Sequence, residues 1–268
     1  MYVEHLSYSS ASSYAMCPNS WKMKYVNRLA TSVSANLLFG KAFHSTVEHD
    51  VRSRCIGTGM QDLAGMWDKE WKKEVAAAGN VDWGTKSETE YFDDGVRMFS
   101  NKDVMHAVRQ LNAIMMHPLI VGSDRVSVPA PSVELKFEFQ IDKVGVPIIG
   151  YIDIIGADGV PVDLKTSSQS WNQEKAAAEV QPAMYLAALN QCGYVQHNGR
   201  FRYVIFVKTK TPKVQVIDIT CSPEHIKWTM QMMRDVWRGI KGSVFPCNPT
   251  GWKCSPKYCE FWEMCRGG

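Results

Sequence analysis

Two neighbouring segments decide the predicted fold of this 268-residue chain: Gly150-Tyr151-Ile152-Asp153-Ile154-Ile155 and Val160-Pro161-Val162-Asp163-Leu164-Lys165-Thr166. They are joined by Ala157-Asp158-Gly159, a turn signal that predicts a β-hairpin. Side chains alternate between the two faces of a strand, so Asp163 and Lys165 are expected on the same side. Charged groups in an apolar hairpin are costly to bury without a partner. A divalent cation held by Asp153 and Asp163, with Lys165 beside it, would be such a partner.

The periodicity of the sequence around this hairpin predicts an α/β fold. Alternating apolar and polar residues predict a strand before the hairpin, at about 133–141, and two strands after it, at about 202–207 and 214–219. Helices are predicted at about 7–16, 35–54, 60–78, 88–116, 172–192 and 223–240. Pro182 in the fifth of these is expected to mark either a kink or the first turn of a new helix.

This order of elements predicts three regions. Residues 1–125 would form a helical N-terminal region, residues 126–245 the α/β core, and residues 246–268 a cysteine-rich tail that packs on the N-terminal region. The likeliest flexible joint lies at about 121–132, where glycine, serine and proline gather.

The overall composition is that of an ordinary globular protein. The net charge is +3 and the isoelectric point about 8.3, a mildly basic balance that permits a nucleic-acid partner without requiring one. No apolar run approaches the roughly 20 residues that cross a bilayer, and the N-terminus lacks the pattern of a signal peptide. A cytoplasmic protein without membrane partners is therefore expected, in the bacterial host cell if a phage encodes it. Its eight cysteines would be thiols or metal ligands.

Two carboxylates and a lysine can together hydrolyse a phosphodiester. The reaction needs a cation to neutralise charge on the phosphate, an activated water molecule, and a group that orients or deprotonates that water. Asp153 and Asp163 would hold Mg²⁺ or Mn²⁺, hard cations that prefer oxygen ligands. Lys165 would orient the water or stabilise charge on the scissile phosphate, and the backbone carbonyl of Leu164 could be a further ligand.

The pattern resembles the PD-(D/E)XK nuclease superfamily. Its members have an acidic residue on one strand and (D/E)-x-K on the next, and its RecB-like members add an upstream G-x-x-x-H and a downstream Q-x-x-x-Y. The matching segments in this chain are, in the same order, Gly40-Lys41-Ala42-Phe43-His44, Gly150-Tyr151-Ile152-Asp153, Asp163-Leu164-Lys165 and Gln181-Pro182-Ala183-Met184-Tyr185. The resemblance implies a restriction-endonuclease-like fold, with a mixed central sheet flanked by helices.

The resemblance also implies a role for each matched residue. The expected metal ligands are His44, Asp153, Asp163 and the carbonyl of Leu164. Lys165 would be the catalytic lysine, and Gln181 and Tyr185 would face the active site, where they contact DNA or support the lysine. They lie four residues apart, on one face of a helix. Glu134 on the preceding strand has either a weak supporting role or faces solvent.

The C-terminal tail predicts a metal centre of a second kind. Four cysteines fall within 19 residues, a density for which a soft metal or a cluster is the default explanation: Cys247, Cys254, Cys259 and Cys265. A zinc ion held by these four thiols is one alternative. Cys55, Cys192 and Cys221, which lie in apolar or helical settings, are predicted to be plain buried thiols.

An iron–sulfur cluster is the other alternative, and it also rests on a resemblance. Cys17-Pro18 follows the first predicted helix, as in the iron–sulfur subgroup of RecB-like nucleases, which includes AddB-type, CRISPR-associated and phage exonucleases. That resemblance implies a [4Fe-4S] cluster held by Cys17, Cys254, Cys259 and Cys265. The spacing here is C-x₄-C-x₅-C, whereas the subgroup opens its C-terminal group with C-x-x-C, so Cys247 could replace Cys17.

The function predicted from these motifs is that of a metal-dependent deoxyribonuclease, most readily an exonuclease that acts on DNA ends or single strands in recombination, replication or repair. A structure-selective endonuclease, or a non-catalytic DNA-binding subunit with a structural zinc, are the alternatives. The sequence has no Walker-type nucleotide-binding motif, so any unwinding would come from a helicase or recombination protein in trans. The aromatic residues of the tail would shield the cluster or stack on bases: Trp252, Tyr258, Phe261 and Trp262.

Overall fold

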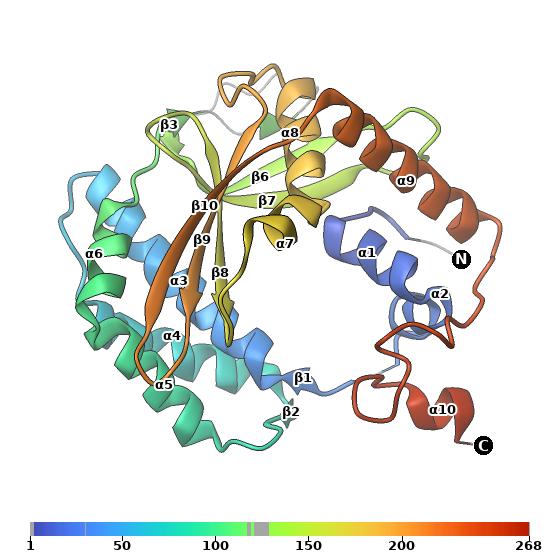
Figure 1. Ribbon diagram of the computed structural model, residues 1–268, viewed down its shortest axis with the longest axis horizontal. Helices are drawn as coiled ribbons and strands as arrows, with labels where there is room; N and C mark the ends of the chain where they lie inside the picture. The colour runs from blue at the N-terminus through green and yellow to red at the C-terminus, as the bar shows by residue number, and fades with distance from the viewer. Residues whose placement is uncertain (1–2, 30, 117–118, 121–128, 268) are drawn as a thin grey trace.

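A computed structural model describes residues 3–29, 31–116, 119–120 and 129–267 of the chain (Figure 1). A mixed sheet forms its centre, in the order β10-β9-β8-β7-β6-β4. The strands are β4 (Leu119–Ile120), β6 (Val133–Phe139), β7 (Ile148–Ile155), β8 (Pro161–Ser167), β9 (Arg200–Val207) and β10 (Lys213–Thr220). The β4–β6 and β8–β9 pairs are parallel and the other pairs antiparallel. The predicted mixed sheet flanked by helices is therefore confirmed.

The hydrophobic pattern explains why these segments are strands. In β6 the residues of V-E-L-K-F-E-F alternate between buried apolar side chains and more exposed polar ones. The predicted hairpin is present, since β7 and β8 pair in antiparallel fashion across a tight turn at residues 156–160. Gly159 has φ +76° in that turn, a conformation that favours glycine. The flexible joint predicted at about 121–132 falls mostly outside the described residues.

Four helices cover one face of the sheet: α3 (Ala35–Cys55), α4 (Leu63–Ala78), α5 (Glu88–Ser100) and α6 (Lys102–Gln110). Trp67 and Trp71 pack there as core residues, exposed by 0% and 2%, as their four-residue spacing predicted. The single helix predicted over 88–116 is wrong. The chain breaks at Asn101, whose side chain accepts hydrogen bonds from the N–H groups of Asp103 and Val104 and so begins α6.

The opposite face is covered by α1 (Tyr8–Met16), α7 (Gln173–Ala178), α8 (Gln181–Gln191) and α9 (Pro223–Lys241). The segment predicted as one helix over 172–192 is two helices, because the chain leaves helical geometry at Glu179. Pro182 lies in the first turn of α8, where its missing N–H removes no hydrogen bond. Of the two alternatives for this proline, the new helix is the correct one.

The two ends of the chain pack together beside this second face (Figure 1). After α1 come α2 (Pro18–Trp21) and a π-helical turn, η1 (Lys22–Val26), and the last element is α10 (Trp262–Arg266). The Trp21 ring stacks on Phe245, with centroids 5.9 Å apart, and the Tyr14 hydroxyl donates to the Val244 carbonyl over 2.5 Å. Residues from both ends of the chain thus join the core on this face of the sheet. The division into regions 1–125, 126–245 and 246–268 stays a prediction.

Two further short sheets complete the described elements: β1 (Val33–Ser34) with β2 (Val81–Asp82), and β3 (Met115–Met116) with β5 (Ala130–Pro131). The sequence patterns did not predict these two-residue strands. Within the described ranges, no helix is both long enough and apolar enough to span a bilayer.

Candidate active site and cysteine pocket

The candidate active site lies where β7 and β8 separate. The two strands pair only next to the turn, through Ile154 with Val162 and Ile155 with Pro161. Beyond these pairs, β8 continues alongside β9. The N–H of Leu164 is then free to donate to Asp153 Oδ2, over 2.7 Å. The end of pairing therefore lets the Asp153 carboxylate reach the backbone of the residue that follows Asp163.

The orientation of Asp153 depends on a local irregularity that the sequence pattern did not predict. Pairs Val133 with Ile154 and Leu135 with Ile152 flank Glu134 and Asp153, and Glu134 has φ +50°. Val133 and Ile154 belong to the core under α3, whereas Leu135 and Ile152 belong to the core on the opposite face. The regular alternation of faces is thus interrupted at Asp153.

Lys165 lies at the centre of a hydrogen-bonded group from two elements. Its Nζ is 2.6 Å from Asp163 Oδ2 and donates to Gln181 Oε1 over 3.0 Å. The amide nitrogen of Gln181 donates to Asp163 Oδ1 over 2.7 Å and to the Tyr185 hydroxyl over 3.0 Å. Gln181 and Tyr185 face this site from one turn of α8, as their spacing predicted. Gln181 therefore holds the lysine and the carboxylate in a fixed relation.

His44 approaches the same site from the other side of the sheet. It lies on α3, and its Nδ1 is 3.6 Å from Asp153 Oδ2. Gly40, one turn earlier, faces β8, where a Cβ would lie 3.5 Å from Thr166 Oγ1. The G-x-x-x-H segment thus brings the helix close to the strand that carries Asp163. The structure brings His44, Asp153, Asp163 and Lys165 together, and their roles as ligands and catalyst stay predictions.

Burial dominates the electrostatics of these groups. It lowers the pKa of His44 to about 4, so the imidazole is neutral at neutral pH and has a free nitrogen lone pair. Burial and the neighbouring Asp163 raise the pKa of Asp153 well above its usual value. Burial alone would lower the pKa of Lys165, but Asp163 outweighs it and the pKa rises, so this lysine stays charged. Carboxylate oxygens beside a neutral imidazole form a donor set that suits Mg²⁺ or Mn²⁺.

Glu48 is a residue of this site that the sequence analysis missed. It lies one turn after His44 on α3, and burial together with the adjacent Glu134 raises its pKa to about 9. Glu134, for which a supporting role or a solvent-facing position was left open, is exposed and contacts Glu48. The i+4 spacing from His44 was a signal that could have indicated Glu48.

Two tyrosines near Lys165 were also missed. Tyr203 pairs with Asp163 across β8 and β9, and Lys165 Nζ lies 5.9 Å from the centre of its buried ring. Tyr8, on α1, donates a hydrogen bond to Glu179 Oε2 over 3.3 Å, and the charge of Lys165 acts to lower its pKa, although burial raises that pKa overall. Both contacts depend on tertiary packing, so no local pattern indicates them.

The glycine of the G-x-x-D segment has a packing role. A Cβ on Gly150 would lie 2.3 Å from Phe137 Cζ, and the Phe137 ring packs edge-on against Tyr185 at 5.2 Å. We expect Gly150→Ala to reduce the free energy of unfolding by about 1–3 kcal/mol, because the buried Phe137 ring must move. Urea denaturation followed by circular dichroism measures this. Gly40→Ala is the matched control, since its Cβ makes an ordinary contact, and a comparable loss there would contradict the packing explanation.

A second centre lies between the two ends of the chain. A cavity of about 360 Å³ is lined by five cysteines: Cys17, Cys247, Cys254, Cys259 and Cys265. Cys17 ends α1 and Pro18 begins α2, so the Cys-Pro pair sits at a helix junction. The Sγ atoms of Cys247 and Cys265 are 3.6 Å apart. Of the cysteines predicted to be plain buried thiols, Cys221 is buried, whereas Cys55 and Cys192 are half-buried.

The residues predicted to hold metals are thus gathered in two places. In the described part of the chain, no three His, Cys, Asp or Glu side chains converge closely enough to hold a single metal ion. The donor chemistry nevertheless fits the expected groups: hard oxygens at the strand separation, and soft thiolates around the cavity. The assignments of ligands to either centre stay predictions.

Comparisons with known proteins show the family and the fold to which this chain is similar. The family model described as the PD-(D/E)XK nuclease superfamily matches residues 5–266. The Gene 69 protein of Mycobacterium phage D29 is 24% identical over 277 residues, which cover 97% of this chain and 95% of that protein. The crystal structure of a presumed exonuclease from Eubacterium rectale superposes on this chain with a TM-score of 0.53 at 15% sequence identity. The match covers 99% of this chain and 88% of the exonuclease chain.

Proposed function

This chain belongs to the PD-(D/E)XK nuclease superfamily, and from that premise we propose that it is a metal-dependent deoxyribonuclease that acts on DNA ends or single strands. The observation that carries the proposal is the position of Lys165. Its ammonium group lies 2.6 Å from Asp163 and 3.0 Å from Gln181, at the point where β7 and β8 separate. Asp153 is on the neighbouring strand, and both carboxylates are buried at 8% and 3% exposure.

Each residue of the site has a distinct part in the proposed reaction. Mg²⁺ or Mn²⁺, when bound by His44, Asp153, Asp163 and the carbonyl of Leu164, would neutralise charge on the scissile phosphate and acidify the attacking water. Lys165 orients that water or stabilises the charge that develops on the phosphate. Gln181 fixes Lys165 relative to Asp163, and Tyr185 supports Gln181 through its hydroxyl.

An exonuclease is the form of this activity that we favour over a structure-selective endonuclease. The presumed exonuclease of Eubacterium rectale shares the fold over nearly the whole chain, which supports this choice. We propose that the enzyme acts in recombination, replication or repair, in the cytoplasm of a bacterial host. The similarity to a phage protein is consistent with a phage-encoded chain. A helicase or recombination protein in trans would supply any unwinding.

The experiment is digestion of labelled DNA under anaerobic conditions with Mg²⁺ or Mn²⁺. We expect linear single strands and duplexes to be shortened from their ends, covalently closed circular single strands to stay intact, and EDTA to abolish cleavage. An RNA strand of the same sequence tests the choice of DNA. Cut circles would show an endonuclease, and intact substrates under every condition would favour a non-catalytic DNA-binding subunit.

We further propose that the cysteine pocket holds a [4Fe-4S] cluster through Cys17, Cys254, Cys259 and Cys265. The support is that these four thiols line one cavity, and Cys thiolates are the ligands of such clusters. Cys247 also lines the cavity, so a zinc ion held by the four cysteines of the tail is the alternative.

A further inference from the structure

The aromatic residues of the C-terminal segment fall into two groups by burial. Phe261 is 1% exposed and lines the cysteine cavity together with the half-buried Trp262, so these two can shield a cluster from water. Trp252 and Tyr258 are 64% and 54% exposed. Tyr258 also lines the cavity, but both residues are mostly exposed, and shielding does not explain the exposure of Trp252, which is not a lining residue.

The two exposed rings form one surface that carries positive charge. Their centroids are 5.6 Å apart, with an angle of 69° between the ring planes. Lys253 Nζ lies 5.4 Å from the Trp252 ring centre, and Lys257 Nζ lies 5.2 Å from the Tyr258 ring centre. We call these four residues the aromatic platform. Exposed aromatic faces between ammonium groups suit a ligand with flat apolar bases and a charged backbone.

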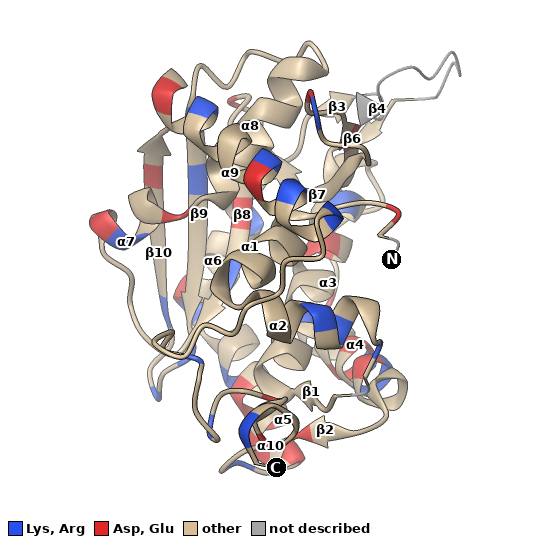
Figure 2. Ribbon diagram, turned by 90° about the vertical axis from the view of Figure 1, so that its right-hand side faces the viewer, with Lys and Arg blue, Asp and Glu red and all other residues tan. Residues whose placement is uncertain are grey.

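The N-terminal elements near the aromatic platform carry no acidic residue that would repel a phosphate. Residues 5–47 contain no Asp or Glu, whereas η1 carries Lys22 and Lys24. In Figure 2, α1 is tan throughout because it contains no charged residue, and the next basic residues, in blue, lie near α2. The C-terminal segment has two acidic residues: Glu260, which lies 3.8 Å from Lys24 and is partly neutralised by it, and Glu263 on α10. An anionic strand can therefore lie along these elements.

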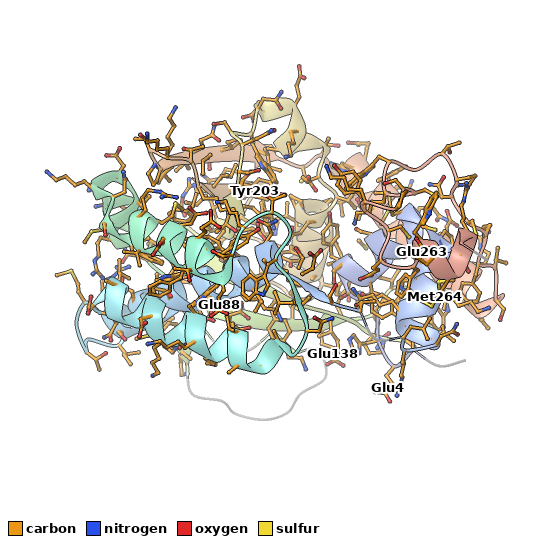
Figure 3. All side chains as sticks on the ribbon, turned by 90° about the horizontal axis from the view of Figure 1, so that it is seen from below. Glu4, Glu88, Glu138, Tyr203, Glu263 and Met264 are labelled. Atoms are coloured by element: carbon orange, nitrogen blue, oxygen red, sulfur yellow. The ribbon has the colours of Figure 1, made fainter. Side chains whose placement is uncertain are left out.

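The acid-free stretch connects the aromatic platform with the active site. At its far end, α1 and α2 pack on the C-terminal segment: Asn248 donates to the Met16 carbonyl over 2.9 Å, and the Asn19 N–H to the Pro246 carbonyl over 3.2 Å. At its near end, Tyr8 lies close enough to Lys165 for the lysine charge to act on its pKa, and its hydroxyl donates to Glu179, an acidic residue that flanks the stretch there. In Figure 3, Met264 of α10 lies at one end of the molecule and Tyr203, beside Lys165, lies toward the middle.

We propose that the aromatic platform binds single-stranded DNA by stacking unpaired bases on Trp252 and Tyr258, several nucleotides away from the cleavage site. The proposal rests on the nuclease function proposed above and adds the form of the substrate. Single strands are favoured over duplex because only unpaired bases expose faces that can stack on a side chain. Lys253 and Lys257 would contact the phosphates that flank the stacked bases.

Fluorescence anisotropy of a labelled oligothymidylate, in EDTA so that no cleavage occurs, tests the platform. Trp252→Ala is expected to raise the Kd of the full-length protein for this probe by roughly 5- to 100-fold. Trp252→Phe should restore most of the affinity, because a ring remains. Met60→Ala is the control, since Met60 is 71% exposed but lies between α3 and α4, on the opposite side of the sheet from α1, and it should leave the Kd unchanged.

A blunt duplex and the salt dependence separate stacking from other effects. Trp252→Ala should leave the Kd for the duplex nearly unchanged, and Lys253→Gln should reduce the slope of log K against log salt by about 0.7 for the single strand. An unchanged Kd for oligothymidylate, or an equal loss on the duplex, would overturn the proposal. So would loss of iron from Trp252→Ala, since it would indicate a shielding role. A wild-type protein that binds the probe but cuts no DNA with Mg²⁺ or Mn²⁺ would instead overturn the nuclease function alone.

Discussion

Replacing Lys165 with alanine is expected to lower the rate of metal-dependent DNA cleavage by roughly 10²–10⁴-fold. The ammonium group is the one cation in contact with both Asp163 and Gln181 among the described side chains, and its raised pKa keeps it charged at neutral pH. Its loss removes the donor that would orient water or stabilise the phosphate. Such a decrease corresponds to about 3–5 kcal/mol of transition-state stabilisation.

The structure indicates that Lys165→Ala will fold. Asp163 loses its ion pair, but Gln181 still donates to Asp163 Oδ1 over 2.7 Å, so the buried carboxylate keeps a hydrogen bond. Single-turnover cleavage of end-labelled DNA gives the rate, and thermal unfolding monitors the fold. Lys72→Ala is the control, because this 70% exposed lysine on α4 pairs only with Asp68 in the described structure. Full cleavage by folded Lys165→Ala would refute the catalytic assignment.

Short-range patterns were sufficient to predict much of the fold and of the candidate site. The turn at Gly159 and the alternation in β6 are local properties, so the hairpin and the strand before it could be read from the sequence. Gln181 and Tyr185 lie on one face because they are four residues apart and α8 is helical from Gln181 to Gln191. These elements are the ones in which local preference and tertiary packing agree.

The parts that could not be predicted depend on contacts between distant segments. The interruption of alternation at Glu134 and Asp153 arises from the pairing of β6 with β7, and Tyr203 reaches Lys165 only because β8 lies parallel to β9. The break between α5 and α6 is a different case. Asn101 is a good N-cap residue, so its signal was present in the sequence but was outweighed by the continuous helical composition around it.

Cys259→Ser is expected to abolish iron binding and to lower the melting temperature on the order of 10 °C. Cys259 comes from the C-terminal segment and Cys17 from the end of α1, so a shared cluster closes a loop of most of the chain. Constraining so long a loop stabilises the folded state by about 5 kcal/mol in chain-entropy models. For a protein of this size, each kcal/mol corresponds to about 2–4 °C.

The measurements are iron and sulfide content, absorption at about 400 nm after anaerobic purification, and thermal unfolding. Cys55→Ser is the matched control, because Cys55 lies away from the cavity and its hydroxyl replacement can still donate to the Ala113 carbonyl. Cys247→Ser decides the ligand set. Four irons retained in Cys247→Ser would assign the fourth ligand to Cys17, and loss of the cluster would assign it to Cys247. A colourless wild-type protein that contains zinc would overturn the cluster, and since the thiols lie apart from Lys165, it would leave the nuclease site unaffected.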